Sequence, residues 1–226
     1  MPITKIWLSW SSGKDSAWAI HELRNAGSFE VTGLITTINR DAGRVAMHAV
    51  RQELVEAQAQ ALGVPLVKIP IPAQCSNAVY DSAMESAMAE ARTAGVQHIA
   101  FGDLFLEDIR RYREERLQSV GMTPVFPLWA RPTAALAREM IDGGLRAYLT
   151  CVDPKQLEPR FAGREFDNDL LEDLPGGADP CGEKGEFHTF AFAGPMFSHP
   201  LGVMLGETVT RDGFVFADVL PHGTKL

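Results

Sequence analysis

The chain has 226 residues, of which 46% are hydrophobic, and a formal net charge of −8 at pH 7. This length suits one large domain or two small ones, and the apolar content is enough for a substantial core. The acidic balance argues against broad nucleic-acid binding, which requires a basic surface. The apolar runs are far shorter than a membrane span and the N-terminus lacks the features of a signal peptide, so we expect a cytoplasmic protein without membrane contact.

The first 130 residues alternate short apolar strands with amphipathic helices. Strands are expected at residues 6–8, 31–37, 66–70, 98–103 and 123–128, and helices at residues 17–24, 50–62, 78–94 and 106–120. This alternation predicts an α/β fold with a parallel, doubly wound sheet and right-handed crossovers. Ligands of such sheets bind at the carboxyl ends of the strands.

The pattern changes after residue 130. A helix is expected at residues 132–142, a strand at 146–152, a helix between loops within 154–180 and a strand at 187–192. Residues 206–217 read as a hairpin that turns at Arg211, Asp212 and Gly213. We therefore predict an ATP-binding domain at residues 1–130 and a smaller, mixed α+β substrate-binding domain at residues 131–226.

A loop of small polar residues follows the first strand and precedes the first helix, an arrangement that points backbone N–H groups at one space and favours anions. We call it the serine loop, and its candidate nucleotide ligands are Ser11, Ser12, Gly13, Lys14, Asp15 and Ser16. Lys14 supplies a countercharge, whereas a carboxylate at Asp15 is favourable beside phosphate mainly with a bridging Mg²⁺. Neither the Walker loop nor the dinucleotide fingerprint matches. The alternative is a serine-capped helix with a surface lysine.

Further candidates lie at or just after other strand ends. Thr36 ends the second strand, and His48 lies in the long connection that follows it. Gly102 would admit a ligand closely, and Asp103 would hold Mg²⁺ or orient an amine. Arg113, on a helix whose other charges read as a solvated face, could hold a carboxylate or phosphate by two bonds.

A second informative stretch, residues 179–189, is called here the acidic loop. It carries Glu183 and Glu186 between glycines, together with Cys181. Such a loop is either an acidic surface turn or a site that binds an ammonium group or a metal, or assists proton transfer. Cys181 has no evident base partner for a nucleophilic role. The three cysteines of the chain form no C-x-x-C pair, so no disulfide framework or structural zinc site is expected.

The serine loop resembles the S-G-G-x-D-S signature of the PP-loop ATP pyrophosphatases, with Ser12 in place of the first glycine. Four motifs occur in an order that resembles the diphthine–ammonia ligase family, in its bacterial form: the serine loop, Gly102-Asp103 before an R-x-x-R-E-E helix, Pro127-Leu128-Trp129, and the Gly-Glu-x-Gly-Glu-Phe segment of the acidic loop. The resemblance covers nearly the whole chain. It implies an ATP pyrophosphatase fold of the adenine nucleotide alpha hydrolase type.

The resemblance also implies a reaction. ATP with Mg²⁺ would be cleaved between the α and β phosphates, and a carboxylate would be activated as an adenylate for attack by ammonia or an amine. Residues assigned to catalysis are Lys14, Asp103, Arg113, Glu183 and Glu186; those assigned to ATP are the six of the serine loop with Thr36, His48 and Gly102; and the metal ligand is Asp15. The expected partners are a small-molecule or protein carboxylate acceptor and an amine, and a homodimer is kept open.

Two rival functions remain at this point. The same loops would serve a nucleotide hydrolase or sensor without ligase activity. They would also serve an ATP-dependent enzyme that modifies tRNA, against which the acidic net charge argues. Release of pyrophosphate that depends on an added acceptor would separate the ligase from the sensor.

Overall fold

The computed structural model describes residues 3–45, 50–72 and 75–224, which form two β-sheets. Sheet A contains five parallel strands in the order β4-β2-β1-β5-β6, and a short strand, β3, pairs antiparallel with the end of β2. Their bounds are β1 (Thr4–Ser9), β2 (Phe29–Asn39), β3 (Arg44–Val45), β4 (Leu66–Ile71), β5 (His98–Ala100) and β6 (Thr123–Val125).

Helices cover both faces of sheet A, as the sequence predicts for a doubly wound sheet. They are α1 (Lys14–Ala26), α2 (Gln52–Leu62), α3 (Asn77–Thr93) and α4 (Glu107–Ser119). Alternate residues of β1 show the two faces: Ile6 and Leu8 join one buried cluster with residues of α1 and α2, whereas Trp7 joins a second cluster with residues of α3 and α4. A strand buried on both faces explains the continuous apolar run in this part of the sequence.

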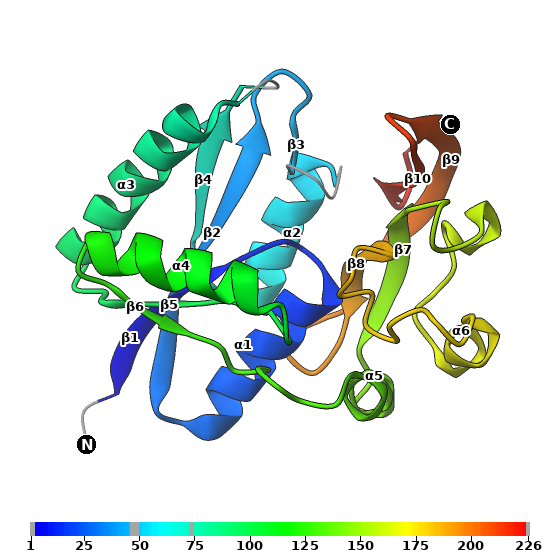
Figure 1. The fold of residues 1–226 in the computed structure, drawn as a ribbon, viewed down its shortest axis with the longest axis horizontal. Coiled ribbons are helices and arrows are strands. Elements are labelled where there is room, and N and C mark those ends of the chain that lie inside the picture. Colours follow the sequence, from blue (N-terminus) through cyan, green and yellow to red (C-terminus); the bar gives the residue numbers. More distant parts are fainter. Residues whose placement is uncertain (1–2, 46–49, 73–74, 225–226) are drawn as a thin grey trace.

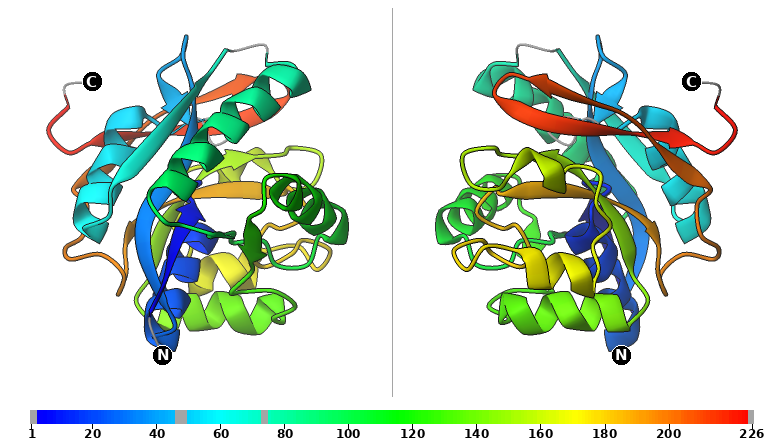
Figure 2. Two further views of the ribbon diagram at one scale, coloured as in Figure 1. Left: turned by 90° about the vertical axis from the view of Figure 1, so that its left-hand side faces the viewer. Right: turned by 90° about the vertical axis from the view of Figure 1, so that its right-hand side faces the viewer.

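Sheet B is antiparallel, with the strand order β8-β7-β10-β9. Its strands are β7 (Arg146–Val152), β8 (Phe187–Ala193), β9 (Val203–Arg211) and β10 (Phe214–Pro221). The same part of the chain contains the helices α5 (Thr133–Asp142) and α6 (Asn168–Asp173) and the 3₁₀ turn η1 (Pro159–Phe161). Figure 1 shows the two sheets in different halves of the molecule, and Figure 2 shows β9 and β10 at the end where β2 and β4 finish. The α/β fold with a second, mixed part is confirmed.

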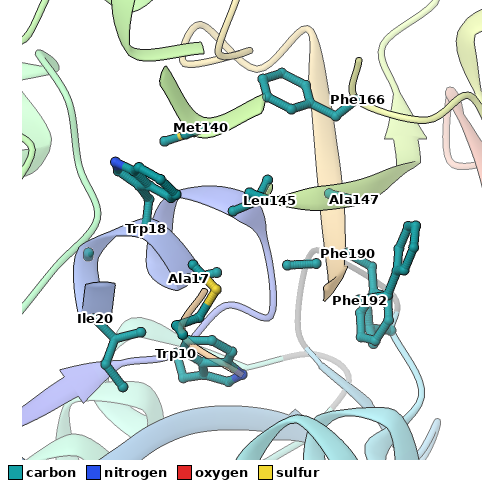
Figure 3. Packing of buried hydrophobic residues seen from close by; sticks show 14 of the residues in the cluster. Trp10, Ala17, Trp18, Ile20, Met140, Leu145, Ala147, Phe166, Phe190 and Phe192 are labelled. Carbon is teal, nitrogen blue, oxygen red and sulfur yellow. The ribbon is translucent and has the colours of Figure 1, made fainter. Parts of the chain in front are cut away.

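The two sheets share a hydrophobic core. Trp10 and Trp18, from the start of the chain, belong to the same buried cluster as Leu145, Phe166 and Phe190 from the sheet B region. Figure 3 shows these side chains gathered between α1 and the strands of sheet B. Because interiors are close-packed, this shared core fixes the loops of sheet B relative to the N-terminus of α1.

Several bounds differ from those expected from the sequence, and β6, for example, ends at Val125 rather than at residue 128. β2 is longer, and the connection after it contains β3 rather than an irregular loop, while residues 46–49, which include His48, lie outside the described residues. β5 ends at Ala100 instead of continuing to Asp103. Within the described parts of the chain, no helix combines the length and the apolar character needed to cross a membrane.

Candidate functional site

The serine loop links the end of β1 to the N-terminus of α1. Ser12 has a φ of 73°, in the left-handed region, and Gly13 is the residue that precedes the first turn of α1. A Cβ atom at Gly13 would lie 3.1 Å from the carbonyl oxygen of Thr189 in β8, a tight contact that glycine avoids, so glycine favours the close approach of the two segments. The loop therefore takes its shape partly from sheet B.

Hydrogen bonds from β8 hold the serine loop. The backbone N–H of Lys14 donates to Thr189 Oγ1 at 3.0 Å, and the N–H of Ala191 donates to the carbonyl of Ser12 at 2.9 Å. The end of the acidic loop and its strand β8 therefore contact the serine loop directly. One of the first N–H groups of α1 is already used, which leaves its neighbours for an anion.

Gln58 in α2 is a positioning residue that the sequence reasoning missed. Its side chain is fully buried, accepts from Trp10 Nε1 at 2.9 Å, and donates to the carbonyls of Ser12 and Ala191 at 2.9 and 2.7 Å. All three bonds tie the serine loop to β8. The available signal was a glutamine beside Ala59 on the apolar side of an amphipathic helix, a place where a polar side chain needs buried partners.

The side chain of Lys14 is buried and turns away from solvent. Its ammonium group donates to both carboxylate oxygens of Asp15, at 2.8 and 3.0 Å, and to the carbonyl of Cys181, and lies 5.5 Å from the ring centres of Phe166 and Phe187. Burial opposes the charge, but the neighbouring acidic groups, Asp15 first, outweigh it and raise the pKa of Lys14. Lys14 is therefore charged and fastens the acidic loop to α1, a structural role that was not expected.

Two hydroxyl groups at this edge lack protein partners among the described residues. Within the described residues, Ser12 Oγ and Thr36 Oγ1 are buried without a hydrogen bond, whereas Ser11 Oγ and Ser16 Oγ lie 3.1 Å apart. Buried hydroxyls of this kind normally have a partner, so they fit a site that a polar ligand completes.

Gly102 allows close packing of the protein against itself. A Cβ atom there would lie 2.9 Å from the carbonyl carbon of Asp15 and 3.0 Å from the backbone nitrogen of Ser16. The chain after β5 therefore touches the first turn of α1 directly. The sequence interpretation, that this glycine admits a ligand, stays untested, but the contact with α1 already accounts for it.

Asp103 and Arg113 form an ion pair beside Gly102. Arg113 Nε lies 2.7 Å from Asp103 Oδ2, and a terminal nitrogen of Arg113 donates to Oδ1 at 3.1 Å. The guanidinium carbon of Arg113 also lies 4.3 Å from the ring centre of Phe101. Arg113 therefore already holds a carboxylate, that of Asp103, through one hydrogen bond and one close ion-pair contact.

The acidic loop is organised by its own carboxylates. Glu186 is fully buried and accepts from the backbone N–H of Asp179 at 2.7 Å and of Lys184 at 3.0 Å. Asp179 accepts in turn from the N–H of Cys181 at 2.9 Å. Both oxygens of Glu186 face its own loop, so these bonds position the loop, and the catalytic role assigned to Glu186 stays a prediction.

Glu183 is the carboxylate of this loop that faces sheet A. It accepts from the backbone N–H of Leu104 at 2.8 Å. The pKa of Glu183 is raised to about 7, chiefly by burial and also by Asp15 and Asp103, while the Leu104 N–H and Lys14 act in the opposite direction. A carboxyl group with this pKa changes protonation near neutral pH, which suits a proton acceptor.

The structure also bears on the reactivity of Cys181 and on the side chains near a possible metal. Burial raises the pKa of Cys181 to about 12, and its Sγ donates to the carbonyl of Thr133 at 3.4 Å, so this thiol is not an activated nucleophile. Among the described residues there is no group of three His, Cys, Asp or Glu side chains that could hold a metal ion. Any metal here would depend on ligand oxygens as well as on Asp15.

Comparisons with known proteins agree with this arrangement. The family model for the diphthamide synthase N-terminal domain matches residues 4–124, and the model for the diphthamide synthase C-terminal domain matches residues 132–217. Relatives named diphthine–ammonia ligase include those of Bos taurus, 27% identical over 75% of this chain and 69% of the relative, and Homo sapiens, 32% identical over 55% of this chain and 48% of the relative. The chain thus spans about half the length of some of these relatives.

A solved structure is also similar. It is the U34-tRNA thiolase NcsA from Methanococcus maripaludis with its [4Fe-4S] cluster, which has a TM-score of 0.37 and 14% sequence identity. The similarity covers 62% of this chain and 56% of that one. At this level it carries no argument about function.

Proposed function

Because the chain belongs to the diphthamide synthase family, we propose that it is an ATP-dependent ligase that forms an amide from a carboxylate and ammonia. The observation that carries the proposal is the contact between the serine loop and the acidic loop. Lys14 is bonded to both Asp15 and Cys181, which places the N-terminus of α1 beside Glu183. The proposed phosphate site at the N-terminus of α1 and the proposed proton acceptor, Glu183, therefore lie next to each other.

ATP binds at the serine loop in this proposal. The first turn of α1 and the turn at Ser12 supply backbone N–H groups and the positive end of the helix dipole to the phosphates. The unpartnered hydroxyls of Ser12 and Thr36 fit polar groups of the nucleotide. Lys14 contributes positive charge from behind Asp15, because its ammonium is held by that carboxylate.

Asp15 would hold Mg²⁺ together with phosphate oxygens. Mg²⁺ in nucleotide sites commonly takes one or two carboxylates and fills its remaining positions with phosphate and water, so a set of three protein ligands is not required. The Asp15 side chain keeps 26% of its surface exposed beside the buried Lys14, so it can reach such an ion. When bound, the ion would neutralise charge that develops on the leaving pyrophosphate.

Glu183 acts on the amine. The acceptor carboxylate attacks the α-phosphorus of ATP, pyrophosphate leaves, and ammonia then attacks the activated carbonyl carbon and displaces AMP. The nitrogen must lose a proton, and Glu183 takes it, since its pKa of about 7 leaves much of it ionised at neutral pH. Asp103, held by Arg113, adds negative charge that attracts an ammonium ion.

The test uses the full chain with ATP, MgCl₂ and NH₄Cl, with and without a protein that carries diphthine, the substrate in the names of the relatives. AMP and pyrophosphate are measured by chromatography. Acceptor-dependent AMP with a new amide supports the proposal, whereas ADP and phosphate as main products refute it. AMP formed equally without an acceptor favours the hydrolase reading. Glu183→Gln should lower turnover by roughly a hundredfold, and the exposed Glu158→Gln, 70% accessible, is the control.

A further inference from the structure

The outer strand of sheet B, β9, has one free edge. Among the described residues it pairs only with β10, and Figure 1 shows it at the rim of the molecule. Residues 207–211 of this strand are all exposed, and Val209 at their centre retains 47% of its accessible surface. An exposed strand edge presents backbone N–H and C=O groups that can pair with a further strand.

The hairpin fixes which backbone groups face that edge. The turn residues Asp212 and Gly213 have φ values of 53° and 84°, and Arg211 is paired with Phe214 across the turn. In a two-residue hairpin of this type the flanking residues exchange hydrogen bonds, and the pattern alternates along the strand. The N–H and C=O groups of Thr208 and Thr210 therefore point to the open edge, whereas those of Val209 point to β10.

The sequence of this edge is complementary to itself. If a second copy of β9 pairs antiparallel with the two-fold axis at Val209, Thr208 lies opposite Thr210 of the second copy and Glu207 lies opposite Arg211. The hydrogen-bonding groups then meet, and two pairs of opposite charge form by symmetry. A slip of two residues in either direction removes both charge pairs, and a slip of four places two like charges together.

We propose that the partner of this edge is a second copy of the chain, joined through β9 to make a continuous eight-stranded sheet. Charge complementarity selects the partner and the register. Glu207, Val209 and Arg211 also line a cavity of about 180 Å³ between sheet B and the β3 region of sheet A, so Arg211 of the second copy lies at the rim of this cavity. The inference does not depend on the proposed reaction.

The pairing is short. The register of β9 with β10 shifts between Leu205 and Thr208, in a bulge that contains Glu207, so the new backbone pairing is confined to residues 208–210 and Glu207 lies at its end. A pairing of so few residues buries little surface for a specific interface, so we expect a weak dimer whose dissociation constant lies in the micromolar range.

Sedimentation equilibrium of the full chain through the micromolar range tests the proposal. Glu207→Arg creates two like-charge pairs and should weaken the dimer about tenfold or more, and Arg211→Glu should do the same. An equal mixture of these two variants should dimerise again, because each strand then meets its charge complement. Glu158→Arg, the same charge change on an exposed residue outside sheet B, is the control and should have no effect.

A second experiment tests the register. In a Cys75→Ser background, Val209→Cys should form a disulfide-linked dimer, because Cα atoms of a non-hydrogen-bonded antiparallel pair lie about 4.5 Å apart. Thr208→Cys, which would face Thr210, should not. Thr210→Pro removes an N–H that points to the edge and should abolish the dimer while the hairpin still folds. A monomer at every concentration, or a dimer that none of these changes weakens, overturns the proposal.

Discussion

Removal of the buried ammonium of Lys14 should lower the stability of the fold, and this should be its main effect rather than weaker nucleotide binding. In Lys14→Met the carbonyl of Cys181 loses its donor, a cost of about 1–3 kcal/mol for a buried acceptor. The broken ion pair with Asp15 adds less than the full cost for a buried pair, because the Asp15 side chain is 26% exposed. Together we expect a loss of about 3 kcal/mol, or roughly 6–12 °C in melting temperature for a chain of this size.

Urea unfolding followed by tryptophan fluorescence measures this loss. The matched control is Lys68→Met, since Lys68 is 40% exposed and pairs with the equally exposed Glu56, a surface bridge worth less than about 1 kcal/mol. The double variant Lys14→Met with Asp15→Asn should recover part of the loss by removing the unpaired charge. If Lys14→Met is as stable as the control and only binds Mg·ATP more weakly, the ammonium is free to meet phosphate and the fastening role is wrong.

The remaining predictions concern three other positions. Glu183→Gln should gain stability relative to the wild type as pH rises from about 5 to about 8, because the raised pKa makes the folded wild type lose stability through about pH 7; parallel pH–stability curves would contradict this. Gly102→Ala should displace the first turn of α1 and weaken ATP binding, measured by calorimetry, while the melting temperature falls little. An ATP affinity equal to that of the wild type would show that the contact between Gly102 and α1 is not needed for binding. Glu186→Gln should cost about 1–3 kcal/mol, seen in thermal unfolding, because the amide cannot accept from both backbone N–H groups; an unchanged melting temperature would restore a purely catalytic reading.

The main elements of the fold could be predicted from local sequence patterns. The continuous apolar run of β1 predicts a strand that is buried on both faces, and turn residues that tolerate positive φ predict the hairpin at Asp212 and Gly213. Strand β3 could not be seen, because two residues carry no periodicity, and its formation depends on pairing with the end of β2. The close approach of Gly102 to the first turn of α1 is likewise a contact that no local pattern records.

Residue types indicated the place of the site better than the role of each member. The serine and acidic loops do meet, through the hydrogen bonds of Lys14 to Thr189 and to Cys181. The direction of each side chain was decided by partners distant in sequence. Glu186 turned to its own loop, whereas Glu183 reached Leu104, and nothing in the spacing of two glutamates distinguishes these outcomes.

The turn at Ser12 shows why the second sheet belongs to the phosphate site. A residue with a Cβ atom in the left-handed region carries a strain of about 1–2 kcal/mol, and it persists only where the surroundings determine the conformation. Here the carbonyl of Ser12 accepts from Ala191 in β8 and from Gln58, which is itself bonded to Ala191. Sheet B therefore imposes the backbone shape that a glycine would adopt freely, and a perturbation of β8 should reach the phosphate site even though no residue of β8 need touch the nucleotide.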